Sequence, residues 1–338
     1  MNGRLILTKT SDLVKNANND IMTENLKIPI LANSYTDLSE FDFSFKGIQI
    51  MDVKTSFFAN YLDSLEGNDE KWDYHEMFEE VVLQNIEEHE KYYAIVKTEP
   101  FENFNYREIL AVYKLLLIIF PSDLQIQYVL EFNGYDLGMS ISSWQRTYTG
   151  EYPGKILYLP DAPVSEINEF VEKVFVRMNE KGAIGYIIEN YITSYEASHR
   201  HFQYLNLCFC LETIVDGRTE LTYRMKRNVA ILCGTSSFNS QLIFDNITKI
   251  YNLRSKIVHG DTYNEQKIED YLPFLISIVS RTIIELLIHD IYDITAIGRL
   301  NKRITTLGFG DRHKISDDWK KFDFNIFTMT TSNWIRLQ

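Results

Sequence analysis

Residues 251–260 read YNLRSKIVHG, with arginine at position 254, histidine at position 259 and glycine directly after the histidine. Apolar residues lead into this stretch and cross it at spacings of three and four, the pattern of a buried helix face. These residues are Leu242, Ile243, Ile247, Ile250, Leu253 and Ile257. Gly260 lacks a Cβ and adopts the left-handed conformation that ends many helices at little cost. The pattern predicts a helix over residues 240–259, with Arg254 late in it and His259 at its end.

The spacing of Arg254 and His259 limits how they can act together. Five residues at about 100° each put the two side chains roughly 140° apart on a straight helix. They cannot both reach one substrate from a regular helix. Either the last turn unwinds, or a second copy of the helix supplies the partner residue. We expect both, with two antiparallel copies of this helix meeting at a dimer axis.

An arginine and a histidine are sufficient for one known kind of chemistry. A guanidinium carries forked donors that match phosphate oxygens, and it stays charged at any working pH. An imidazole gives or takes a proton near neutrality. Together they could cleave RNA without a metal, because histidine handles the proton of the 2′-hydroxyl and arginine stabilises charge on phosphorus oxygens. DNA lacks that hydroxyl. The alternative is that the two residues are not catalytic, because the C-terminus of a helix favours positively charged side chains in any case.

The surroundings of the pair support the first interpretation. Upstream of it lie Leu211-Glu212-Thr213, then Thr219 to Arg224, then Arg227 and Ala230-Ile231-Leu232. In this order and spacing, residues 200–290 resemble the Apea-like branch of the HEPN superfamily (higher eukaryotes and prokaryotes nucleotide-binding). The signature of that superfamily is an arginine, four to six residues, and a histidine.

The resemblance implies a helical bundle that dimerises around the motif helix and acts as a metal-independent endoribonuclease, with no cofactor. Such proteins are common in anti-phage abortive infection and toxin systems, so a phage-derived trigger or a neighbouring antitoxin is a possible partner. The resemblance makes Arg254 and His259 catalytic. Many members have Asn, Asp or His after the arginine, whereas Ser255 stands here. That departure keeps open a non-catalytic HEPN module that binds RNA, a nucleotide or a protein.

Four further residues are candidates for supporting roles. Glu212 is a charge in an apolar helical context and needs a partner, so it could orient Arg254 or Lys256 across the bundle, or form a purely structural ion pair. Arg224 and Arg227 are three apart on one helix face and could contact phosphates, or could form ordinary surface salt bridges. Lys256 is a candidate RNA contact.

Three other features have simpler explanations. His199 and His201 resemble a metal pair, but no Cys, Asp or Glu accompanies them at ligand spacing, and we predict no metal site. Tyr251 is expected in the core rather than as a base-stacking platform. His289, on an apolar helix, is expected to be a hydrogen-bonded core histidine.

Composition places the chain among soluble proteins. The net charge of −13 argues against nucleic-acid affinity over the whole surface. Residues 218–260 differ: seven basic and two acidic residues give +5, which leaves −18 elsewhere. This basic stretch could admit RNA, dock an acidic domain, or be a solvated face. The three cysteines lie in apolar segments, as expected of reduced thiols in a cytoplasmic protein. No signal peptide or membrane span is expected.

The fold class expected is mainly α, with a C-terminal HEPN helical bundle and an N-terminal α+β region. We expect an N-terminal regulatory or sensing region over 1–163, the bundle over 164–292, and a C-terminal tail over 293–338 that packs on the body. Expected bundle helices span 165–178, 183–195, 199–215, 220–232, 240–259 and 265–289. In the N-terminal region we expect a hairpin at 41–50, helices at 74–97 and 107–120, and strands at 124–130 and 155–159.

Overall fold

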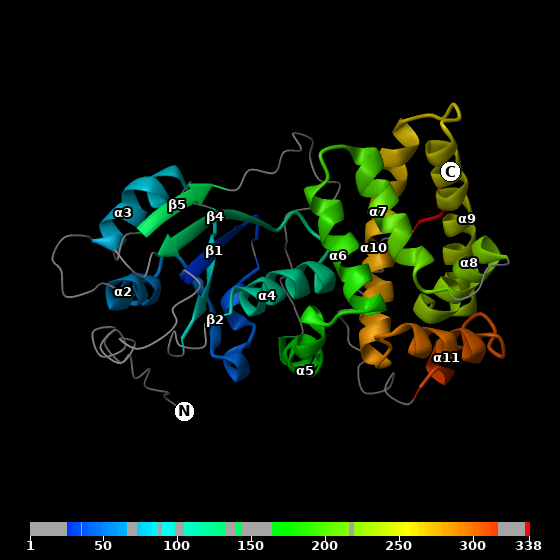
Figure 1. Ribbon diagram of the computed structural model, residues 1–338, viewed down its shortest axis with the longest axis horizontal. Helices are drawn as coiled ribbons and strands as arrows, with labels where there is room; N and C mark the ends of the chain where they lie inside the picture. Colours follow the sequence, from blue (N-terminus) through cyan, green and yellow to red (C-terminus); the bar gives the residue numbers. More distant parts are fainter. Residues whose placement is uncertain are drawn as a thin grey trace. The chain divides into compact units, whose positions relative to one another are not determined.

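The computed structural model describes residues 26–34, 36–65, 73–86, 90–98, 105–132, 139–143, 164–215, 220–316 and 335–338. It divides into two compact units (Figure 1). The N-terminal unit comprises residues 1–112, 123–145 and 156–161, and the helical unit comprises 113–122, 146–155 and 162–338. The fold is mainly helical with an N-terminal α+β part, which confirms this much of the fold class that the sequence predicts.

A five-stranded antiparallel sheet forms the frame of the N-terminal unit. Its strand order is β2-β3-β1-β4-β5. The strands are β1 (Leu26–Ala32), β2 (Ile48–Asp52), β3 (Tyr93–Lys97), β4 (Gln125–Phe132) and β5 (Met139–Ser143). The register of β1 against β4 shifts between Ile30 and Leu31. The strand expected at 124–130 is confirmed as β4, while the strand expected at 155–159 lies outside the described residues.

Two helices cover one face of this sheet. They are α2 (Ser56–Leu65) and α3 (Tyr74–Val81), and their buried aromatic residues Phe58 and Phe78 meet edge to face at 5.2 Å. Both pack in one apolar cluster with Ala94 and Val96 of β3. Asp73 caps α3, because its carboxylate accepts from the Glu76 amide at 2.7 Å.

Two predictions for this unit need correction. The helix expected over 74–97 ends at Val81, continues only as the short 3₁₀ turn η3 (Leu83–Asn85), and is followed by β3. All five residues of β3 are buried, so the strand shows no alternation from which it could be recognised. The hairpin expected at 41–50 has one strand only. Its first arm forms the 3₁₀ turn η2 (Ser44–Lys46), and a single bridge joins Phe43 to Ile48 around Gly47. A further 3₁₀ turn, η1, spans Leu38–Glu40.

Helix α4 (Tyr106–Ile119) is the buried helix expected before Pro121. Its first half is assigned to the N-terminal unit and its second half to the helical unit. Within the helical unit, the carbonyl of Leu117 accepts from the Tyr191 hydroxyl at 3.1 Å, and that of Ile118 accepts from the Ser280 hydroxyl at 2.6 Å.

The rest of the helical unit is a bundle around α10. Its helices are α5 (Val164–Val174), with the 3₁₀ turn η5 (Phe175–Asn179), α6 (Ala183–Glu196), α7 (Arg200–Glu212), α8 (Leu221–Cys233), α9 (Ser237–His259), α10 (Gln266–Ile288) and α11 (Ile294–Ile304), and the 3₁₀ turn η6 (Arg312–Lys314) follows. The six helices predicted between residues 165 and 289 are confirmed to within a few residues.

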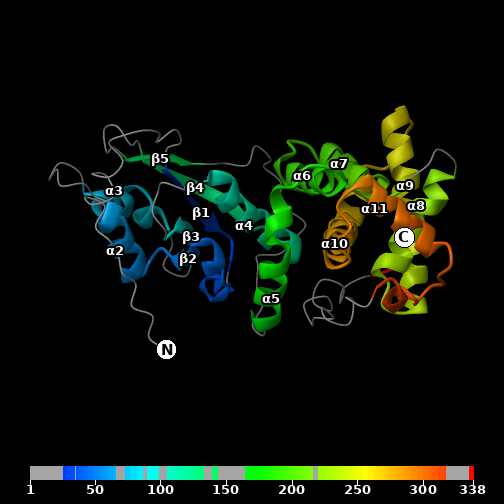
Figure 2. The same ribbon diagram turned by 60° about the horizontal axis from the view of Figure 1, so that its bottom comes forward.

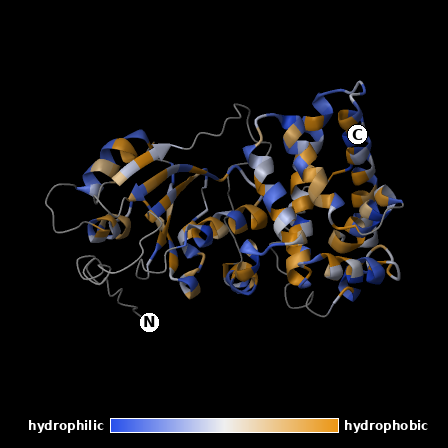
Figure 3. Ribbon diagram, in the orientation of Figure 1, coloured by the Kyte–Doolittle hydropathy of each residue, from blue (hydrophilic) through white to orange (hydrophobic). Residues whose placement is uncertain are grey.

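Helix α10 contacts α6, α7, α8 and α9, and Figures 1 and 2 show it among them. Figure 3 shows hydrophobic residues through most of its length and polar ones at its N-terminal end. Among the described helices, only α10 is long and apolar enough to cross a membrane. Its most apolar window is 89% buried within the protein, which is the setting of a helix in the core of the bundle.

A buried charged cluster lies along one side of α10. Glu285 is fully buried, and its Oε1 lies 2.6 Å from Nη2 of Arg281 and 2.5 Å from Nη2 of Arg312. His289 lies 3.4 Å from the other carboxylate oxygen and hydrogen-bonds the Ser316 hydroxyl at 2.5 Å. His289 is therefore the hydrogen-bonded core histidine that the sequence predicts. The cluster joins η6 to the centre of the bundle.

Residues 294–316 also pack on the bundle, through α8. Arg227 donates to the carbonyls of Ile304 and Leu307 at the end of α11. Buried Asn228 hydrogen-bonds Asn301, whose own amide donates to the Ile214 carbonyl at 3.0 Å. The last four residues form a separate short segment against α9 and α10, drawn in red in Figure 1.

Candidate functional site at the end of α9

Helix α9 carries the arginine and the histidine. Ser236 caps its start, because the hydroxyl accepts from the Asn239 amide at 3.1 Å. Its apolar face is buried as far as Leu253, which is 4% exposed, whereas Ile257 is only half-buried. The helix ends at Gly260 in the left-handed conformation, with φ of 71°. The amides of Gly260 and Asp261 donate to the carbonyls of Ile257 and Lys256, which is a Schellman ending.

Arg254 points from α9 toward the C-terminal end of α7. Its Nε lies 3.0 Å from Oε1 of Glu212, and its Nη2 lies 3.4 Å from Oε2. The side chains of Arg254 and Glu212 are 19% and 29% exposed. The Nη2–Oε2 contact is a hydrogen bond, and the closer Nε–Oε1 contact is an ion pair only, so charge and one long hydrogen bond direct the guanidinium toward Glu212. Glu212 therefore pairs with Arg254, which is one of the partners that the sequence suggests for it.

Aromatic rings and a thiol surround this ion pair. The guanidinium carbon of Arg254 lies 5.5 Å from the Tyr251 ring centre and 5.9 Å from that of Phe209, distances typical of cation–π contact. Burial raises the pKa of Tyr251, and the nearby Glu212 carboxylate raises it further. Burial also raises the pKa of the Cys208 thiol well above its usual value. The cysteines at positions 208, 210 and 233 are all buried and free.

His259 is the last residue of α9, and it is exposed to solvent. The expected unwinding of the last turn is wrong, because the two Schellman hydrogen bonds keep the backbone helical up to Gly260. Arg254 and His259 therefore keep the roughly 140° separation of a regular helix. One chain does not bring them together.

The last turns of α9 are poorly covered by the rest of the chain. No residue from Arg254 to Asp261 is buried, and Val258 is 47% exposed. Ser255 is half-buried and Lys256 is exposed. Figure 2 shows this end of α9 projecting beyond the neighbouring helices.

The two arginines of α8 differ in their surroundings. Arg227 uses both terminal nitrogens on carbonyls at the end of α11, at 2.9 and 2.7 Å, so its guanidinium is engaged within the fold. We therefore leave Arg227 out of the RNA-contacting surface for which the sequence suggests it. Arg224, one turn earlier, is half-buried.

The histidine pair at the start of α7 is not a metal cluster in the described part of the chain. The rings of His199 and His201 are stacked 5.4 Å apart, and Arg200 between them pairs with Glu269 at 3.1 Å. Across the described residues, no three His, Cys, Asp or Glu side chains group closely enough to hold a metal ion.

Sequence reasoning missed a second polar site beside α9. Lys249, Lys256 and Lys267 line one cavity together with residues 262–264. The i, i+7 spacing of the first two lysines signals a shared helix face, but nothing in the sequence places Lys267 opposite them.

Comparison with known proteins adds no further information. No protein-family model matches the chain, and neither the curated proteins nor the solved structures searched contain a significant match.

Proposed function

We propose that the protein is a metal-independent endoribonuclease of the HEPN type, and that it acts as a homodimer. One observation carries this proposal: Arg254 is oriented by a two-point contact with Glu212, five residues before an exposed histidine at an uncovered helix end. An ion pair that served stability alone would not require that exposed histidine. The position of the pair, late in a long bundle helix, agrees with the motif that the sequence resembles.

In the proposed reaction, one His259 removes the proton of an RNA 2′-hydroxyl. The 2′-oxygen then attacks the adjacent phosphorus, and Arg254 stabilises the negative charge that builds on the phosphorus oxygens. The bond to the 5′-oxygen breaks, and that oxygen receives a proton from the protonated His259 of the second copy. The products are a 2′,3′-cyclic phosphate and a 5′-hydroxyl, and no metal takes part.

A second copy is required because the side chains of Arg254 and His259 diverge on one helix. Val258 and half-buried Ile257 supply apolar surface next to the motif, where the single chain leaves it in water. Pairing two α9 ends about a twofold axis would cover this surface and bring arginines and histidines of two chains to one cleft.

By the same resemblance, we propose that the protein acts in the cytoplasm in anti-phage defence or as a toxin. The N-terminal unit would then sense a phage-derived trigger, or a neighbouring antitoxin would restrain the nuclease. Deleting residues 1–163 should raise toxicity in cells if that region restrains the nuclease, and unchanged toxicity would count against restraint.

The direct test is incubation of purified protein with RNA in EDTA. Wild-type protein should produce 5′-hydroxyl ends, and His259→Ala should abolish them. His199→Ala is a matched control, because His199 is also exposed and lies outside the motif. Cleavage that needs a divalent metal, or that persists in His259→Ala, would refute the mechanism.

A non-catalytic HEPN module that binds RNA, a nucleotide or a protein is the second candidate. The Arg254–Glu212 contact also favours it, because the carboxylate already occupies two guanidinium nitrogens. Stable RNA binding without products, weakened in Arg254→Ala, would support this candidate over the nuclease.

A further inference from the structure

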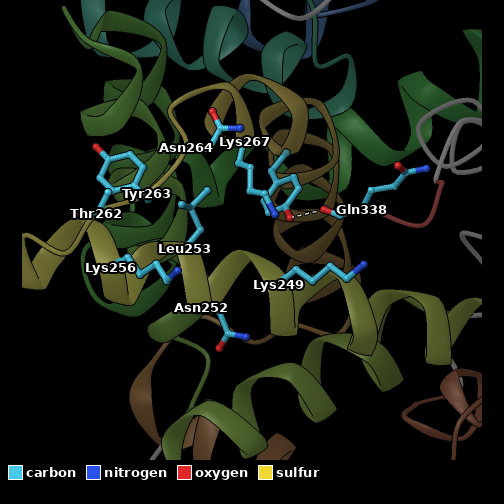
Figure 4. Close-up of a pocket in the computed structure, with 10 residues that line it drawn as sticks. Lys249, Asn252, Leu253, Lys256, Thr262, Tyr263, Asn264, Lys267 and Gln338 are labelled. Atoms are coloured by element: carbon cyan, nitrogen blue, oxygen red, sulfur yellow. Dashed lines mark hydrogen bonds between the residues drawn. The ribbon is translucent and has the colours of Figure 1, made fainter.

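A cavity of about 660 Å³ lies beside α9, on a different face from the Arg254–Glu212 pair. Its walls come from α9, the start of α10, the loop between them and Gln338 (Figure 4). Lys249, Asn252 and Lys256 line it from one face of α9, because spacings of three and four return to the same side of a helix. Lys267 lines it from α10.

Three ammonium groups line this cavity, and its ten lining residues carry no acidic side chain. Among the described residues, no Asp or Glu oxygen forms an ion pair with Lys249, Lys256 or Lys267. The Lys249 ammonium donates to the carbonyl of Leu337, whereas the ammonium groups of Lys256 and Lys267 have no hydrogen-bonding partner in the described part of the chain, and that of Lys267 lies 6.0 Å from the Tyr271 ring centre. The ammonium groups of Lys256 and Lys267 are therefore available to pair with an anion.

The side chains of Lys256 and Lys267 approach the same hollow from different helices in Figure 4. The remaining lining groups include donors suited to oxygen atoms, the Asn252 amide and the Thr262 hydroxyl among them. Leu253 and Tyr271 also line the cavity, and both are buried, so the inner wall is partly apolar.

Contacts with neighbouring elements hold the walls in place. The Tyr271 hydroxyl donates to the Gln338 carbonyl at 2.6 Å. In the loop, the Asn264 side chain accepts from the Gln266 amide at 3.0 Å and fixes the start of α10. The cavity is therefore formed by the fold itself, and its volume lies in the range of about 300–1,000 Å³ usual for small-molecule sites.

We propose that this cavity binds the phosphate groups of a nucleotide, either free or within an RNA strand. Ammonium groups supply the charge, amide and hydroxyl donors supply direction, and the apolar wall suits a sugar and base. Lys256 is three residues before His259, about 60° away on the helix, so a bound phosphate would lie on the His259 side of α9. Binding itself does not depend on the nuclease proposal.

The test is a binding titration with two probes. One is ATP, and the other is a single-stranded RNA hexamer with 2′-O-methyl groups, which lacks the attacking hydroxyl. The double variant Lys256→Glu/Lys267→Glu should weaken binding of the preferred probe at least tenfold. Lys302→Glu is the matched control, because Lys302 is exposed on α11 of the same unit and does not line the cavity. Thermal unfolding of each variant verifies that it is folded.

The outcomes of this titration distinguish the cavity proposal from the nuclease proposal. If ATP binds and the hexamer does not, the site takes free nucleotides, and tighter binding of the hexamer indicates an RNA strand. If neither probe binds, or if Lys302→Glu weakens binding as much as the double variant, the site proposal is wrong. A wild-type protein that binds a probe but cuts no RNA would overturn the nuclease and leave the cavity assignment in place.

Discussion

The carboxylate of Glu212 contacts the guanidinium of Arg254 at two points, with 3.0 Å between Oε1 and Nε and 3.4 Å between Oε2 and Nη2. This pair joins α7 to α9 five residues before His259. Because both side chains are partly exposed, the pair contributes little to stability, about 1 kcal/mol or less. Its larger effect is on where the guanidinium points.

Glu212→Gln should therefore reduce RNA cleavage more than it reduces stability. The amide keeps the size of the side chain but loses the charge that holds the guanidinium, so we expect kcat to fall roughly tenfold, since misplaced groups lose much of their effect. Single-turnover cleavage at saturating RNA measures this change. Glu189→Gln, at an exposed position on α6, is the control. Cleavage by Glu212→Gln at the wild-type rate would show that Glu212 does not position Arg254.

The sequence predicts the helical unit better than the N-terminal unit, for a physical reason. Helices such as α9 expose one face, so their apolar residues recur at spacings of three and four, and Gly260 marks the end. Strand β3 is buried on both faces, so its sequence YAIVK shows no alternation of buried and exposed positions. Its apolar residues therefore read as a continuation of the apolar pattern of α3. Periodicity detects an element only where one side of it meets water.

The candidate site, too, is predictable only in part, namely where the residues that form it follow a local pattern in the sequence. Arg254 and His259 follow from local spacing, and an unpaired charge in an apolar helix points to Glu212 as a partner. The contacts of Arg227 depend on α11, and the lysine cavity depends on a loop and the last four residues. Such contacts join distant parts of the chain, and no local pattern encodes them.

The left-handed conformation of Gly260 gives a prediction about the end of α9. A Cβ built there meets no atom within 4 Å, so space is not limiting, but φ of 71° is unfavourable for alanine. Gly260→Ala should lower the free energy of unfolding by roughly 1–2 kcal/mol, as urea denaturation would measure. Gly260→Asn should lose less, because asparagine tolerates this region. Equal losses in the two variants would mean that backbone conformation is not the cause.

The buried cluster at Glu285 should make stability depend on acid pH. Burial alone would raise the pKa of Glu285, but Arg281, Arg312 and His289 outweigh it and lower the pKa from its usual 4.5 to about 2. A lowered folded-state pKa stabilises the protein above the unfolded-state value, and this contribution is lost as pH falls from about 4.5 toward 2.

Glu285→Gln should remove this contribution and leave two buried arginines without their shared carboxylate. We expect a loss of about 3–5 kcal/mol at neutral pH. In thermal unfolding scans from pH 7 to pH 2, the gap between wild type and variant should narrow below about pH 4. Glu172→Gln, at an exposed position on α5, should follow wild type throughout. A gap that stays constant to pH 2 would mean that ionisation of Glu285 is not what stabilises the fold.

Asn246 attaches the C-terminal segment to α9. Its side chain is fully buried, donates to the Ile335 carbonyl at 2.8 Å and accepts from the Leu337 amide at 2.9 Å. Asn246→Ala loses both hydrogen bonds, so we expect about 1–3 kcal/mol of destabilisation and faster hydrogen exchange at Leu337. Asn239→Ala, at a half-buried position on the same helix where the side chain donates to the Thr235 hydroxyl instead, should leave that exchange rate unchanged. Unchanged exchange in Asn246→Ala would mean that other contacts hold the segment.

Mixing two inactive variants tests the shared cleft most directly. Arg254→Ala and His259→Ala homodimers should each be inactive, because one lacks the phosphate-stabilising group and the other the proton-transfer group. In a mixed dimer, the His259→Ala chain supplies Arg254 and the Arg254→Ala chain supplies the one His259 that acts as base. Water must then protonate the leaving 5′-oxygen in place of the second His259, so only part of the activity should return. Subunit exchange must be verified independently, for example with differently tagged chains. If each chain worked alone, no mixture could recover cleavage, since neither chain carries both groups. Recovery therefore requires that the roughly 140° between the two side chains be bridged by a second α9.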